Sequence, residues 1–173
     1  NDEYIDFHCH PSLKPFGKSF NYTPSGIHIS HRNSKRSIWH YDPPSIFDKL
    51  LNYVTGLTKF SQANFTSLVR GGVGIVCVSL YPLEKWFIRN KMNNELLLDL
   101  ASNFALGVGD KRIDHIQGIT DYFKDVEAQY NFYMQLDGKV VLLPEGKFRY
   151  KLVKNFTEIE NIKNHNASVG EGG

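Results

Sequence analysis

Residues 73–81, VGIVCVSLY, constrain the fold of this chain more than any other segment. Apolar side chains occupy both alternating faces of the segment, which is typical of a strand in a parallel sheet that lies between layers of helices. Gly71 and Gly72 precede the strand, and such a pair suits the end of a helix that leads directly into it. The segment therefore predicts an α/β fold, with parallel strands and covering helices.

A second strand pattern lies near the start of the chain, in residues 4–10, YIDFHCH. Side chains two positions apart in a strand point to the same face, so Asp6, His8 and His10 share one face and the residues between them share the other. Pro11 ends the strand. We expect this strand to lie in the same parallel sheet as the apolar strand.

Helical patterns lie around the two strands. Ser45 and Asp48 resemble an N-cap pair, and apolar residues follow them at helical spacing as far as Val54. This spacing predicts a helix that begins at Ser45. The other expected helices span residues 62–70, 93–106, 112–136 and 157–165, with Thr157 as the cap of the last.

The remaining segments show no sustained period. Residues 12–44 predict one long loop, and a loop of that length in a compact domain usually carries function or moves. Residues 139–145 suit a short strand or a turn, and the small polar residues 166–173 suit a loop. With 41% hydrophobic residues, the chain has enough apolar material for a packed core, and we expect a single domain over residues 1–173.

Composition excludes several classes of function. The formal net charge is only +2 and the basic residues are spread along the chain, which argues against a nucleic-acid partner. No apolar run reaches the roughly 18 residues that a membrane span needs. The first residues lack the regions of a signal peptide, so a cytoplasmic protein and one exported after signal removal both stay open. Cys9 and Cys77 lie in apolar strand patterns, which predicts buried thiols and no disulfide framework.

The histidines at the end of the first strand form the strongest candidate site. Two imidazoles two positions apart point the same way and can reach one metal ion. In α/β barrels, ligands and catalytic groups gather where strands end at the carboxyl face. His8 and His10 are therefore predicted metal ligands. Asp6, on the same face, is expected either to accept a structural hydrogen bond or to orient an imidazole.

Three stretches carry a resemblance to a known family. DFHCHP, residues 6–11, resembles the first-strand metal motif of amidohydrolase-type barrels, and LVRGGVGIVCVSLYPLE, residues 68–84, resembles the second strand of the membrane dipeptidase (renal dipeptidase) family. YKLVKNFTEIENIKN, residues 150–164, resembles that family's segment before its third strand. The resemblance implies the amino-terminal part of a TIM-type (β/α)8 barrel. It also implies a hydrolase that cleaves a small peptide or amide bond with a metal-activated water.

The resemblance further implies zinc, with two divalent ions in the complete enzyme. In the dipeptidases a first-strand His-x-Asp motif binds one ion, and a glutamate in a Glu-Gly-Gly or Glu-Gly-Ala context bridges the two. Glu171, which Gly172 and Gly173 follow, is the candidate for that glutamate, and a glutamate in a tail or linker is its other interpretation. His10 stands where the dipeptidases have aspartate, which moves the motif toward the general His-x-His pattern of amidohydrolases.

Length adds one more expectation. A complete eight-stranded barrel needs roughly 200 to 250 residues, and this chain of 173 residues shows about two clear strands. We therefore expect an incomplete barrel, in which the later metal ligands are missing and metal binds poorly. Strand 73–81 is apolar on both faces and needs neighbours on both sides. We therefore also expect self-association or pairing with the remainder of the barrel.

Two alternatives stay open at this point. A PHP-type phosphoesterase also begins with an Asp-x-His-x-His strand and would use the histidine pair in a metal cluster that hydrolyses phosphate esters; the Gly-Gly second strand argues mildly against it. A non-catalytic α/β domain, in which the histidines are merely packed, predicts no metal affinity and a closed hydrophobic surface.

Overall fold

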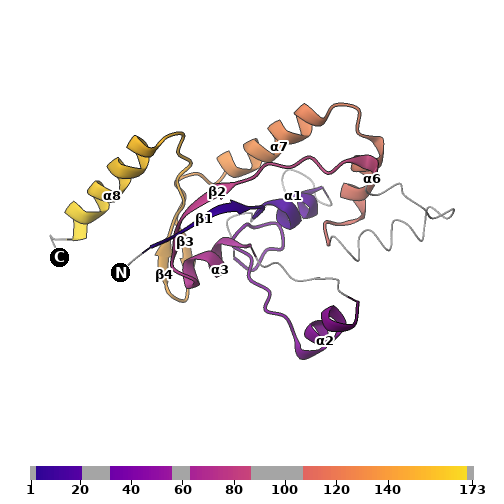
Figure 1. Cartoon of the computed structure of the whole chain (residues 1–173), viewed down its shortest axis with the longest axis horizontal. Coiled ribbons are helices and arrows are strands. Elements are labelled where there is room, and N and C mark those ends of the chain that lie inside the picture. The colour runs from indigo at the N-terminus through magenta and orange to yellow at the C-terminus, as the bar shows by residue number, and fades with distance from the viewer. Residues whose placement is uncertain (1–2, 21–31, 56–62, 87–106, 171–173) are drawn as a thin grey trace.

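The computed structural model describes residues 3–20, 32–55, 63–86 and 107–170 of the chain (Figure 1). The helix expected at residues 93–106 and the candidate ligand Glu171 lie outside the described residues.

Strands β1 (Tyr4–Cys9) and β2 (Val73–Val78) pair in parallel. Helices α2 (Ile46–Thr55) and α3 (Phe65–Arg70) precede β2 in the chain, so the connection between the two strands is helical, as a parallel pairing requires. The prediction of a fold that combines helices with parallel strands is confirmed. Among the described residues the parallel sheet has two strands and does not close into a barrel.

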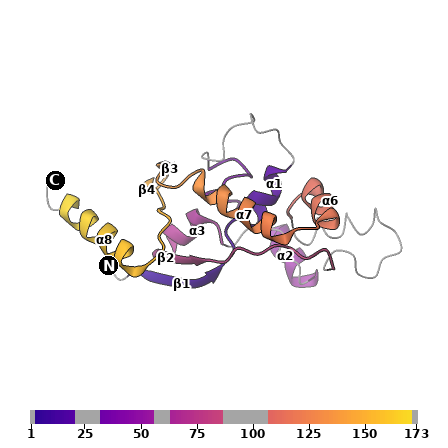
Figure 2. The same ribbon diagram turned by 90° about the horizontal axis from the view of Figure 1, so that it is seen from above.

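Some of the described helices lie over one side of the parallel sheet. Figure 2 shows α1 (Leu13–Ser19), α3 and α7 (Tyr122–Met134) on the same side of the β1–β2 ribbon. Phe7 of β1 is 76% exposed, and Cys77 of β2 is exposed as well. Helices on both faces of the sheet are therefore not found within the described part of the chain. The expectation of a buried Cys77 is wrong because no described element packs over its side chain.

Helix α1 lies within residues 12–44, so the prediction of one continuous loop there is wrong. Pro15 stands in the first turn of this helix, where the missing N–H leaves no hydrogen bond unmade, and Phe16 is buried in the core. Seven residues make only about two turns, too few for a helical period to be recognised. The described residues 32–44 form turns without a helix or strand, as expected for a loop.

Helix α2 begins with the predicted capping pair. The N–H of Asp48 donates to Oγ of Ser45 at 3.1 Å, and the N–H of Ser45 donates to the carboxylate of Asp48 at 3.0 Å. This reciprocal pair satisfies two donors at the helix start. Large apolar side chains on α2, including Ile46, Phe47 and Tyr53, are exposed. The helix therefore presents apolar surface that no described element covers.

A single helix is expected over residues 112–136, and the structure has two, α6 (Asp110–Gly118) and α7. The break lies at Asp121, whose side chain accepts the backbone N–H of Lys124 at 3.2 Å and so caps α7. Apolar residues continue at helical spacing on both sides of the break. Periodicity alone therefore predicts one helix where an N-cap starts a second.

Strands β3 (Val141–Leu143) and β4 (Gly146–Phe148) form an antiparallel hairpin. The sequence predicts either a short strand or a turn at residues 139–145, and the structure has a strand followed by a turn there. Upstream of β2, helix α3 occupies the end of the predicted segment 62–70. Asn64 caps it by accepting the backbone N–H of Ser67 at 2.8 Å.

The last helix, α8 (Phe156–Gly170), begins one residue before Thr157 and continues past His165. Asn155, not Thr157, caps it, because the Asn155 side chain accepts the backbone N–H of Glu158 at 3.0 Å. The prediction of a loop after His165 is wrong as far as Gly170. Once a helix has begun, each further residue adds a hydrogen bond without a new nucleation cost.

The main hydrophobic core lies between α3, α7 and the β3–β4 hairpin. Trp39 is 2% exposed, and its ring meets that of Phe65 at 5.4 Å between centroids. The loop after α1 is thereby anchored in the core. None of the helices in the described ranges is long and apolar enough to cross a membrane. The buried core members are Phe16, Ile38, Trp39, Phe65, Phe132, Tyr133, Leu136, Val141 and Leu143.

Candidate metal-binding site

The histidine pair lies at the carboxyl end of the parallel sheet. His8 belongs to the last residues of β1, His10 follows the strand directly, and Ser79 follows the end of the neighbouring strand β2. The backbone N–H of Ser79 donates to the carbonyl of Cys9 at 2.9 Å, which continues the pairing of the two strands by one step. The two histidines and the end of β2 therefore meet at one edge of the sheet.

A local irregularity in β1 shapes this edge. Asp6 pairs with Val76 and Cys9 with Val78, so three steps along β1 match two along β2. The carboxylate of Asp6 accepts the backbone N–H of His8 at 2.9 Å within this irregular stretch. A strand residue that leaves the ladder needs another partner for its N–H. Asp6 thus acts on His8 through the backbone, in an exposed hydrogen bond.

Asp6 also contacts the buried thiol of Cys9. Burial, together with the nearby charge and hydrogen bond of Asp6, raises the pKa of this thiol to about 11. A thiolate is therefore disfavoured at this position. Cys9 lies between the two histidines in sequence, yet the structure gives it the properties of a packed, protonated thiol.

The two imidazoles lie side by side. Their ring centroids are 4.9 Å apart and their planes are almost perpendicular, at 87°. The period of two predicts this common side, and the irregularity in β1 does not separate the rings. His8 is exposed and His10 is half-buried, so the pair borders on solvent.

The Nδ1 atom of His10 lies 2.9 Å from the backbone carbonyl oxygen of Ser79. A carbonyl oxygen only accepts, so the imidazole must donate through an Nδ1–H group. In the neutral imidazole the proton on Nδ1 leaves Nε2 with a free lone pair. Histidine ligands of metals usually have this arrangement, with the second ring nitrogen bound to a carbonyl or carboxylate.

The Nδ1 atom of His8 lies 3.0 Å from Oγ of the same residue, Ser79. A hydroxyl can donate or accept, so this contact is compatible with an Nδ1–H group on His8 as well. Both rings therefore use Nδ1 toward Ser79. Their Nε2 atoms make no hydrogen bond within the described residues.

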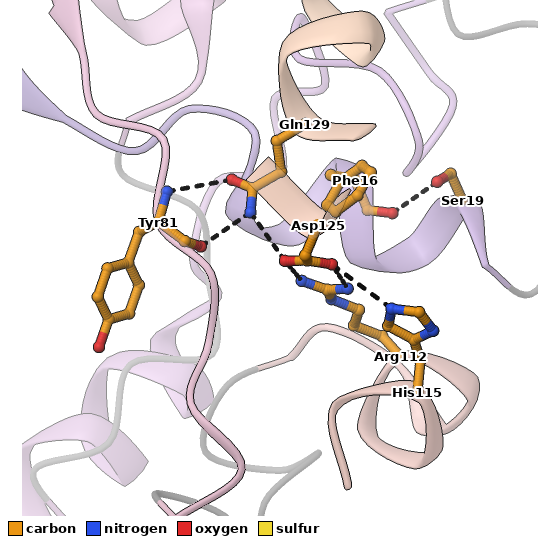
Figure 3. A network of polar contacts seen from close by, with 7 residues as sticks. All are labelled: Phe16, Ser19, Tyr81, Arg112, His115, Asp125 and Gln129. Atoms are coloured by element: carbon orange, nitrogen blue, oxygen red, sulfur yellow. Dashed lines mark hydrogen bonds and ion pairs between the residues drawn. The ribbon is translucent and has the colours of Figure 1, made fainter. Parts of the chain in front are cut away.

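The next residues after β2 are held by a buried polar cluster (Figure 3). The side-chain amide of Gln129 accepts the backbone N–H of Tyr81 at 3.3 Å and donates to the Tyr81 carbonyl at 2.8 Å. The same amide donates to Asp125 at 3.2 Å. The ring of Tyr81 lies 5.9 Å from that of His10. The cluster thus fixes the chain segment that forms one side of the histidine pair.

An ion pair forms the centre of this cluster. The guanidinium of Arg112 donates two hydrogen bonds to the carboxylate of Asp125, and their side chains are 2% and 1% exposed. The guanidinium also lies over the ring of Phe16, 4.9 Å from its centroid. Nearby His115 has a lowered pKa because it is partly buried and lies close to Arg112, although Asp125 acts in the opposite direction.

The described residues contain no group of three or more histidine, cysteine, aspartate or glutamate side chains that could hold a metal ion. Two imidazoles supply two of the four positions of a tetrahedral zinc site. Their chemistry fits a metal, because each ring presents Nε2 when its proton is on Nδ1, but other ligands are needed to complete a site. The third candidate ligand, Glu171, lies outside the described residues.

Comparison of the chain with protein-family models found no match, and comparisons with curated proteins and with solved structures found none either.

The sequence analysis missed three residues that contribute to this edge of the sheet. Ser79 is a polar residue in the otherwise apolar segment 73–81. A polar side chain in such a segment indicates a hydrogen-bonding role. Asp125 and Gln129 stand one helical turn apart in α7, a spacing that places two polar side chains on one face with the apolar residues that reach the core. Buried polar residues of this kind require partners, which indicates a network before any coordinates are known.

Proposed function

We propose that this chain belongs to a metal-dependent hydrolase, in which His8 and His10 bind a divalent cation, with zinc as the first candidate. The observation that carries the proposal is the common use of Nδ1 by both imidazoles toward Ser79. With the proton of each ring on Nδ1, that arrangement leaves two adjacent Nε2 lone pairs at the carboxyl end of parallel strands. Metal-binding histidines need such a lone pair and such an orientation.

The sequence resemblance supports a more specific form of the proposal. The motif DFHCHP and the Gly-Gly strand resemble the membrane dipeptidase family, whose fold is a TIM-type barrel. The parallel pairing of β1 with β2 and the helical connection between them are compatible with the start of such a barrel. We therefore propose a small peptide or amide as the substrate, and two divalent ions in the complete site.

Each residue of the candidate site has a distinct part in this proposal. His8 and His10 present Nε2 to the cation, Ser79 holds their Nδ1 atoms, and Asp6 fixes the backbone of His8. When bound, a divalent cation supplies activation of water for hydrolysis, because it lowers the pKa of that water toward neutrality. Glu171 is proposed as a further ligand on the resemblance alone.

The test uses the full natural gene product loaded with zinc. Dipeptides, cyclic amides and phosphate esters are offered as substrates, and hydrolysis is measured for the wild type and for His8→Ala and His10→Ala. We expect cleavage of a peptide or amide that both substitutions abolish. His165→Ala is the control, since His165 is exposed on α8, outside the polar cluster that holds Tyr81, and should leave the chemistry in place.

Three results would contradict the proposal. Cleavage of phosphate esters alone would identify the PHP-type alternative, which uses the same histidine pair. Zinc binding without hydrolysis of any substrate would mean a metal site that does not serve hydrolysis. No zinc binding by the full product would favour a non-catalytic domain in which the histidines are only packed.

A further inference from the structure

We propose that Ser79 is a positioning residue that selects the Nδ1–H tautomer of both histidines, His10 through its backbone and His8 through its hydroxyl. The inference rests on the proposed function for its purpose, because a metal ligand needs a free Nε2. Its geometry and its test are independent of any metal.

All three polar groups of Ser79 take part in the candidate site. Its N–H donates to the carbonyl of Cys9 at 2.9 Å, and its carbonyl accepts from Nδ1 of His10 at 2.9 Å. Its Oγ lies 3.0 Å from Nδ1 of His8. One residue at the end of β2 is thus bonded to the backbone between the histidines and to both of their rings.

The two ring contacts differ in chemistry. The carbonyl oxygen only accepts, so it forces the proton of His10 onto Nδ1 whatever the side chain at position 79. The hydroxyl can accept from His8 or donate to it. Because the tautomer of an imidazole follows the hydrogen bond that its ring nitrogens make, only His8 depends on the Ser79 side chain.

This difference gives the inference an internal control. Removal of the hydroxyl in Ser79→Ala takes away the partner of Nδ1 in His8 and leaves the carbonyl bound to His10. His8 then borders on solvent, where an imidazole favours the Nε2–H form. A single substitution should therefore change one ring and leave its neighbour 4.9 Å away unchanged.

The experiment is long-range ¹H–¹⁵N spectroscopy of the histidine rings in the ¹⁵N-labelled, metal-free protein. It is recorded at about pH 8.5, where an ordinary imidazole is neutral. We expect an Nδ1–H pattern for both rings in the wild type. Ser79→Ala should move His8 toward Nε2–H and leave His10 as it was, and Ser79→Thr should restore His8 because it keeps the hydroxyl. Ser19→Ala removes another half-buried hydroxyl, one bound to the Phe16 carbonyl, and should change neither ring.

The wild-type spectrum can overturn the inference even if the alanine variant does not fold. An Nε2–H pattern for His8 in the wild type would mean that the Ser79 hydroxyl donates to the ring. An unchanged His8 in a folded Ser79→Ala variant would also overturn it.

A zinc titration of the full natural product separates this inference from the proposed function. With the tautomers as expected, Ser79→Ala should weaken zinc binding by about 10- to 100-fold, the usual effect of losing the partner of a histidine ligand. Expected tautomers without zinc binding would leave the positioning by Ser79 in place and defeat the proposed function. If zinc binds but the tautomer of His8 does not respond to Ser79→Ala, the proposed function stands and the positioning by Ser79 is defeated.

Discussion

The side-chain amide of Gln129 binds both backbone polar groups of Tyr81, through an N–H···Oε1 bond of 3.3 Å and an Nε2–H···O bond of 2.8 Å. The amide thereby takes the place that a neighbouring strand would have beside the segment after β2. It joins α7 to the residue whose ring lies against His10. The positions of the candidate site therefore depend on a side chain from a distant helix.

Gln129→Ala should destabilise the protein by about 1–3 kcal/mol, because it leaves partly buried backbone groups of Tyr81 without partners. It also removes a donor from Asp125. The free energy of unfolding in urea measures the loss. Gln135→Ala, at an exposed position just beyond α7, is the matched control and should have a much smaller effect. Equal effects of the two substitutions would show that the amide of Gln129 contributes no special support.

The buried ion pair predicts strong coupling between Arg112 and Asp125. Arg112→Met or Asp125→Leu alone leaves an unpaired buried charge, and we expect each to cost about 3–5 kcal/mol of stability. The double variant should cost clearly less than the sum, because no charge then remains unpaired. Urea unfolding of the four proteins gives the coupling energy. Additive losses would contradict a direct interaction between the two side chains.

An exposed ion pair supplies the control for that experiment. Lys163 and Glu3 lie 3.2 Å apart, and each side chain is more than half exposed. Surface pairs of this kind contribute little because water screens them. Lys163→Ala should therefore leave stability nearly unchanged under the same conditions.

Asp137 predicts a loss of stability in acid. Burial raises the pKa of its carboxyl, but hydrogen bonds from the Lys151 ammonium and the Leu152 N–H outweigh burial and hold that pKa below the ordinary value of 3.8. A folded-state pKa below the unfolded one means that the contribution is present above pH 3.8. It is lost as the pH falls through the lower, folded value.

Asp137→Asn should therefore destabilise the protein at neutral pH and have a smaller effect at a pH below 3.8. Unfolding measured for the wild type and the variant across this range checks the sign. Glu127→Gln, at an exposed position on α7, serves as the comparison. A difference between wild type and Asp137→Asn that grows toward acid would contradict the assignment.

Sequence patterns predicted the parts of this structure that follow from local rules. The capping pair of Ser45 and Asp48 follows from short-range chemistry. The parallel pairing of Tyr4–Cys9 with Val73–Val78 follows from their strand patterns and from the helical segment between them. The period of two places the rings of His8 and His10 together. It could not reveal the extra step in β1, because such an irregularity depends on a bond between the Asp6 side chain and the His8 backbone.

The parts that the sequence did not reveal arise from contacts between distant segments. Ser79 meets His8 across 71 positions of the chain, and Gln129 meets Tyr81 across 48. No periodicity within either segment encodes such a meeting. The break at Asp121 shows a related limit, since a capping residue inside an apolar pattern changes one helix into two without altering the pattern.

The exposed apolar surfaces predict self-association of the 173-residue chain. Helix α2 exposes Ile46, Phe47 and Tyr53, each by more than 70%, and β1 exposes Phe7 to a similar degree. Apolar surface on this scale favours contact with a partner, because burial removes it from water. Sedimentation velocity should therefore show a mean mass that rises with concentration, and a dye for apolar surface should bind to the dilute protein.

Substitutions on α2 distinguish association through this helix from nonspecific hydrophobic association. Phe47→Lys should weaken the association, since a charge would have to be buried in the contact. Phe123→Lys places the same change on an equally exposed aromatic residue of α7 and is the matched control, with a smaller effect expected. If α2 forms the contact, the Phe47 variant dissociates at concentrations at which the wild type and the Phe123 variant remain associated. A wild type that stays monomeric at high concentration, melts cooperatively and binds no dye would show that these apolar side chains need no partner.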